Sequence, residues 1–142
     1  MKSLFTALIL TLAVGVLVQR TNAQNRQQRQ ETAQIISSVE VGKQKKASRS
    51  KITVKFVSVI EDSRCPPDVQ CIQAGNARIK VIVSKAGSDP KTFEMNTNLG
   101  AKGNIYNGYA IYLTDLSPVP ETTARFSQNT YKATFSISRL SR

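Results

Sequence analysis

The fold is decided by two stretches, Ile52-Thr53-Val54-Lys55-Phe56-Val57-Ser58-Val59-Ile60 and Ala77-Arg78-Ile79-Lys80-Val81-Ile82-Val83. In both stretches apolar and polar residues alternate with a period of two, which is the pattern of a β-strand with one buried face. The alternation changes phase after Phe56, because Ser58 occupies a position where a core residue is due. A β-bulge near Val57 or a strand end buried on both sides would account for the change. Val and Ile dominate both stretches, so two strands are predicted either way.

Shorter stretches of the same kind lie outside these two. They are residues 33–41, the segment around Phe93 and Met95, residues 109–113 and residues 131–137. Residues 42–50 are expected to form a basic turn or loop, and Gly, Asn and Pro residues separate the other stretches. Helical spacing over three turns occurs only near the N-terminus. We therefore predict an all-β fold, a single small antiparallel β-sandwich or open barrel of about six to seven strands.

The N-terminus has the three-part pattern of a secretory signal peptide. A positive start, Met1-Lys2, precedes the uncharged, Leu-, Ala- and Val-rich residues 4–18, and Thr21-Asn22-Ala23 offers a cleavage site. This apolar run is shorter than the roughly 20 residues of a membrane-spanning helix, although an uncleaved anchor is the alternative. We expect residues 1–23 to be a signal peptide, residues 24–32 a flexible polar tail and residues 33–142 the β domain. The mature chain is then exported, periplasmic or extracellular.

Positive charge is the main feature of the composition. The chain has 20 Lys and Arg against 9 Asp and Glu, a formal net charge of +11. Removal of residues 1–23 takes away two cations and no acid, which leaves +9. Alternation also places cations on the outward side of the strands, at Lys55, Arg78, Lys80 and Lys132. A basic surface favours an anionic surface polymer, lipid head group or protein as partner, or serves solubility alone. Export and the lack of Trp disfavour nucleic acid.

The longest connection without a strand pattern is residues 61–75, between the two best strands. It contains the only two cysteines, Cys65 and Cys71. In an exported chain these are expected to form a disulfide, worth about 2–2.5 kcal/mol in the chain-entropy model. The bridge and the two prolines would preorganise the loop for binding. The candidate contact residues are Asp62, Arg64, Pro66, Pro67 and Asp68.

A purely structural role for this loop is the alternative. Asp62 and Ser63 are common turn formers, and Arg64 could pair with Glu61 or Asp62 simply to complete the loop. One short helical turn is also possible at residues 67–70, inside the bridge.

The run Asp62-Ser63-Arg64-Cys65-Pro66, followed by Cys71 and Ala74-Gly75-Asn76-Ala77, resembles the signature of an uncharacterised family of small exported bacterial β proteins. Residues 108–113, leading to Pro118 and Pro120, and residues 131–135 are also similar, so the resemblance covers about residues 35–137. Many relatives have Trp two residues after the second Cys, where this chain has Gln73. The resemblance implies export and a β fold, and it implies no activity.

Nothing in the sequence points to catalysis. Without histidine the chain lacks the commonest general base and the usual partner of a Ser or Cys nucleophile. Ligands for a tetrahedral metal site are missing, and the oxygens of Glu61, Asp62 and Asp68 are few for calcium. We therefore expect no enzyme activity, no cofactor and no metal.

The expected function is that of a secreted or envelope binding domain. It would use the stapled loop, the basic surface of Lys55, Arg78 and Lys80, or both. The alternative is a protease inhibitor that presents the disulfide-braced, Pro-rich loop as a rigid substrate mimic.

N-terminal processing is directly measurable. When the chain is produced with its own N-terminus in an exporting host, the intact mass of the secreted product should correspond to residues 24–142, with no thiol reactive before reduction. A product that still begins at Met1, or one with free thiols, would contradict the expectation.

Overall fold

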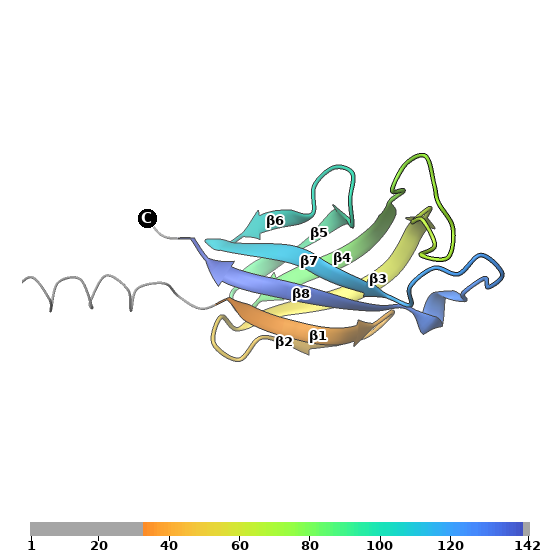
Figure 1. The fold of residues 1–142 in the computed structure, drawn as a ribbon. Coiled ribbons are helices and arrows are strands. Elements are labelled where there is room, and N and C mark those ends of the chain that lie inside the picture. Colours follow the sequence, from red (N-terminus) through yellow and green to blue (C-terminus); the bar gives the residue numbers. More distant parts are fainter. Residues whose placement is uncertain (1–32, 141–142) are drawn as a thin grey trace, which may run out of the picture. The chain divides into compact units, whose positions relative to one another are not determined.

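The computed structural model describes residues 33–140 (Figure 1), so the predicted signal peptide and tail lie outside the described residues. Eight strands and one short 3₁₀ helix make up this part of the chain. The elements are β1 (Gln34–Glu40), β2 (Gln44–Lys46), β3 (Ile52–Asp62), β4 (Ala77–Lys85), β5 (Ser88–Asn96), β6 (Gly103–Tyr106), β7 (Tyr109–Ser117), η1 (Gln128–Thr130) and β8 (Lys132–Arg139). Within this range, no helix has the length and apolar character needed to cross a membrane.

The strands form two four-stranded antiparallel sheets, with the orders β1-β8-β7-β6 and β2-β3-β4-β5. The first and last strands, β1 and β8, pair with each other, while the second sheet is a run of consecutive hairpins. Alternate residues of the central strands are fully buried, among them Phe56, Ile79, Ile111 and Phe135. These residues build the shared apolar core, so the predicted all-β fold is confirmed and takes the form of a sandwich rather than an open barrel.

The structure has two strands beyond the six segments predicted. The prediction of an uninterrupted loop at residues 42–50 is wrong, because β2 pairs with residues 53–55 of β3. All three residues of β2 are exposed, so its sequence lacks the alternation of apolar and polar residues that predicts a strand. The other addition, β6, is joined to β7 by Asn107-Gly108, where φ is 48° and 76°. Positive φ at both positions is the requirement of a type I′ hairpin turn.

Strand β3 contains the irregularity that its sequence suggested. Phe56 lies opposite Val81 but Ser58 lies opposite Lys80, so the pairing shifts by one residue at Val57. A second shift falls between Val59 and Glu61. Val59 is consequently 6% exposed and belongs to the core. A bulge, and not burial on both sides, therefore explains the change of phase.

The bulge predicts unequal costs for two neighbouring valines. Val59→Thr places a hydroxyl in the core and should lower the free energy of unfolding by about 1–3 kcal/mol. Val57→Thr, at the partly exposed bulge, should cost roughly 0.5 kcal/mol or less. Urea unfolding of both variants measures the difference, and equal costs, or the reverse order, would contradict the register.

Candidate functional site

Three connections meet at one end of the sandwich, which we call the loop end (Figure 1). They are residues 63–76 between β3 and β4, residues 97–102 between β5 and β6, and residues 118–131 between β7 and β8. The buried Asn76 ties the first two together, since its Oδ1 accepts hydrogen bonds from the N–H groups of Asn98 (3.0 Å) and Leu99 (3.1 Å). The sequence patterns did not single out Asn76.

The first connection, the stapled loop, has a short ladder at its base. Ser63 N–H donates to the carbonyl of Asn76 at 2.7 Å, and Cys65 N–H donates to that of Ala74 at 3.1 Å. Gly75 has φ +67°, and a Cβ there would lie 1.8 Å from the carbonyl oxygen of Ser63. Only glycine permits so close an approach of the two sides of the loop.

Above this ladder the loop is crosslinked. Cys65 and Cys71 form the predicted disulfide, with their Cα atoms 6.1 Å apart. Inside the bridge the chain makes a single hydrogen-bonded turn over residues 66–69, in place of the helical turn considered for residues 67–70, as Val69 N–H donates to the carbonyl of Pro66 at 3.4 Å. A disulfide of this kind favours a compartment outside the reducing cytoplasm.

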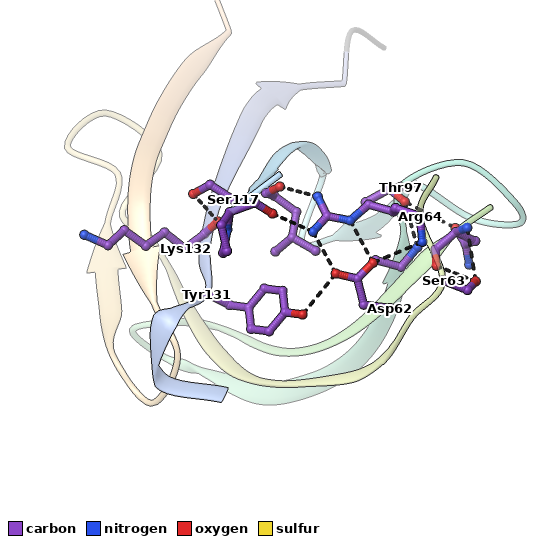
Figure 2. A network of polar contacts seen from close by, with 11 residues as sticks. Asp62, Ser63, Arg64, Thr97, Ser117, Tyr131 and Lys132 are labelled. Carbon is purple, nitrogen blue, oxygen red and sulfur yellow. Dashed lines mark hydrogen bonds and ion pairs between the residues drawn. The ribbon is translucent and has the colours of Figure 1, made fainter. Parts of the chain in front are cut away.

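Arg64 joins the stapled loop to the last connection (Figure 2). Its Nε and Nη2 donate to the two carboxylate oxygens of Asp62 at 2.9 and 2.7 Å. On the other side, its Nη1 and Nη2 donate to the carbonyls of Leu116 and Pro118. Tyr131 completes the group by donating its hydroxyl to Asp62 at 3.0 Å. We refer to Asp62, Arg64 and Tyr131 as the Arg64 clamp.

The clamp is largely shielded from water, because the side chains of Arg64 and Asp62 are only 14% and 11% exposed. Burial by itself raises the pKa of Asp62, but the hydrogen bonds and charge of Arg64, with the Tyr131 hydroxyl, outweigh it and hold that pKa below the usual 3.8. Burial, followed by the hydrogen bond to Asp62 and its negative charge, raises the pKa of Tyr131. The ionised carboxylate is thus the form that the folded protein stabilises.

Two of the predicted contact residues therefore serve the loop itself. Asp62 and Arg64 pair with each other, which is the structural alternative considered for them, with Asp62 rather than Glu61 as the partner. Pro67 and Asp68 are exposed near the tip, and the Asp68 carboxylate accepts a hydrogen bond from the hydroxyl of Thr122. The tip of the stapled loop, not its base, is what remains available to a partner.

The predicted basic residues lie elsewhere. Lys55, Arg78 and Lys80 belong to β3 and β4 of one sheet, away from the core. Arg78 lies 3.4 Å from Glu61 and 3.4 Å from Glu94, so part of the positive charge of this face is balanced. Lys132 also faces outward, as expected, but it is on β8 of the other sheet, 3.3 Å from Glu40.

A cleft of about 470 Å³ separates the end of β3 and the stapled loop from the last connection. The Arg64 clamp and Pro66 lie on its wall. Further lining residues come from the last connection, among them Pro120, Glu121, Arg125 and Phe126. Residues 118–131, the second half of this site, were not predicted as part of it, although their lack of alternation and the two prolines are visible in the sequence.

Gln128 covers the open edge of β3 beside this cleft. Its side-chain amide accepts from Val59 N–H at 3.0 Å and donates to the Val59 carbonyl at 2.8 Å. The amide thereby takes the place of a neighbouring strand where β2 has already ended. On the wall of the cleft, the Val59 backbone groups and the Arg64 clamp are thus bonded to other groups of the protein.

Several exposed apolar side chains lie at the loop end. Of the large apolar residues exposed in the described part of the chain, four lie in the three connections: Val69, Ile72, Leu99 and Val119. Ile72 is fully exposed. Within residues 33–140, no three His, Cys, Asp or Glu side chains are close enough together to hold a metal ion.

Comparison with models of known families, with curated proteins and with solved structures found no match. The resemblance to small exported bacterial proteins therefore stays a prediction.

The clamp gives stability a defined dependence on pH. Since the folded-state pKa of Asp62 lies below 3.8, its contribution is complete above pH 3.8 and is lost as the pH falls through the lower folded value. Asp62→Asn should abolish this acid-dependent part. Arg64→Lys, which loses the planar fork, should lower the free energy of unfolding by about 1–3 kcal/mol at neutral pH.

Urea unfolding across the acid range measures both effects. Arg78→Lys is the matched control, because its ion pairs are longer and more exposed and should be worth less than about 1 kcal/mol. A control that costs as much as Arg64→Lys would contradict the assigned role of the clamp.

Proposed function

We propose that this protein is an exported, non-enzymatic binding domain that contacts a protein partner through the tip of the stapled loop, residues 66–73. The observation that carries the proposal is the position of Ile72, a fully exposed apolar side chain on a loop fixed at its base. The disulfide and the Arg64 clamp immobilise the loop before any partner arrives. A loop ordered in advance loses little conformational entropy on binding, which is the advantage of a preorganised contact surface.

The apolar residues of the neighbouring connections support a protein as the partner. Leu99 and Val119 are exposed in the two neighbouring connections, and exposed apolar side chains at one end of a domain favour a protein contact. The disulfide and the signal-peptide pattern together favour a periplasmic or extracellular location. Membership of the family of small exported bacterial β proteins is part of the same proposal.

The form of the tip favours this role over protease inhibition. A substrate mimic offers the protease an extended segment, whereas Pro66 to Val69 make a turn and Asp68 is bonded to Thr122. We therefore expect no inhibition of serine or cysteine proteases by the purified protein.

The binding role is tested by removing the apolar groups of the tip. Val69→Ser/Ile72→Ser should weaken retention of the partner from an extract of the exported proteins by tenfold or more, since buried apolar anchors dominate such contacts. Stability should change by less than about 0.5 kcal/mol, because both residues are exposed. Quantitative mass spectrometry of the retained proteins gives the readout.

The matched control is Ile35→Ser/Ile105→Ser, which removes two exposed apolar side chains from the other sheet. It should retain the same protein as the unmodified chain. If the tip variant and the unmodified chain retain identical proteins, or if the unmodified chain enriches none, the proposed function is wrong.

A further inference from the structure

Cations gather at the end of the sandwich opposite the loop end. Between Glu40 and Glu61 the sequence contains six Lys and Arg residues and no acid. Lys46, Arg49 and Lys51 lie in or beside the hairpin that joins β2 to β3, and all three are exposed. Figure 1 shows this hairpin at the far end of the domain from the stapled loop.

The end of β4 and the sheet that contains β8 add to this charge. Lys85, at the end of β4, lies opposite Ile52, and its ammonium group is 5.0 Å from the ring centroid of Tyr109. Arg139, at the end of β8, lies opposite Tyr109 in turn. We refer to Lys46, Arg49, Lys51, Lys85 and Arg139 as the basic end. The β4–β5 hairpin adjoins the basic end and contains one acid, Asp89 in β5.

The hairpin holds its cations on a fixed backbone. The side-chain oxygen of Gln34 accepts hydrogen bonds from the N–H groups of Arg49 (2.9 Å) and Ser50 (3.4 Å). Ala47 exchanges backbone bonds with Lys51 and Ile52, and the side chains of Ala47 and Ser50 are buried. The cations of the hairpin are therefore attached to a backbone that is fixed by hydrogen bonds.

We infer that the basic end is a docking surface for an anionic lipid bilayer. Its cations come from both sheets and spread over the whole end, which suits a broad charged plane better than a single polymer strand in a groove. Residues 43–51 contain no large apolar side chain, so this hairpin contacts the bilayer at the level of the lipid head groups. Clusters of four or more Lys and Arg residues bind anionic lipid surfaces in this way, and each cation raises the affinity about fivefold.

The course of the chain agrees with this orientation. Gln34, at the start of β1, contacts the hairpin, so the preceding sequence joins the domain at the basic end. Docking through the basic end points the stapled loop away from the bilayer. The inference does not depend on the proposed function of that loop.

The test uses the protein purified after export and vesicles of phosphatidylcholine, either alone or mixed with phosphatidylglycerol. Sedimentation should show binding to the mixed vesicles only, lost as the salt concentration rises. Lys46→Gln/Arg49→Gln/Lys51→Asn should reduce binding on the order of 100-fold. Asn is chosen at position 51 because it tolerates the φ of 59° found there.

The matched control is Lys55→Gln/Lys80→Gln/Lys102→Gln, which removes the same charge from other places and should reduce binding less than about tenfold. Unfolding midpoints are compared for all proteins, and the single change Arg49→Gln, expected to cost about fivefold, replaces the triple variant if that variant is unstable. Equal losses in the two triple variants, equal binding to neutral vesicles, or binding to a soluble polyanion but not to vesicles would each overturn the inference.

Discussion

The register of β3 on β4 is the constraint on which both the core and the loop end depend. The bulge at Val57 returns Val59 to the buried face, and the shift after it sets the directions of the last two residues of the strand. Glu61 then points to the outer face, where it meets Arg78, while Asp62 turns toward Tyr131 and the last connection. Successive residues of a strand point to opposite faces, so the two adjacent carboxylates have different partners, and the two shifts decide which of them faces outward.

The stapled loop is held by two devices of different kinds. The disulfide closes a short loop, so its effect on the whole domain is modest, and its main consequence is the shape of the tip. The Arg64 clamp acts over a longer distance, because it connects residues more than 50 positions apart in the sequence. Asp62 and Arg64 find several hydrogen-bond partners each, which offsets the cost of removing their charges from water. Bracing of the base and exposure of the tip are therefore complementary properties of one loop.

The elements that could be predicted from the sequence are those that require particular side chains. The alternation at Ile52 and Ile79 predicted β3 and β4, and the only two cysteines predicted their own bridge. β2 escaped prediction because an exposed three-residue strand has no buried face to impose alternation. The pairing of Arg64 with Asp62 could be predicted, because the two residues are close in the sequence. The bonds from Arg64 to the Leu116 and Pro118 carbonyls could not, since every residue has a backbone carbonyl and the sequence does not mark which one is used. The role of Gln128 was hidden for the same reason.

The two ends of β3 carry opposite charges: cations precede the strand and carboxylates end it. Lys51 precedes the strand and Glu61 and Asp62 end it, so roughly 35 Å of extended chain separates the two groups. The two acids that end β3 are paired with Arg64 and Arg78, whereas the basic end contains five Lys and Arg residues. A separation of this size exceeds the screening length of about 8–10 Å at physiological salt. The two ends are therefore electrostatically independent, and a surface that attracts one of them has little influence on the other.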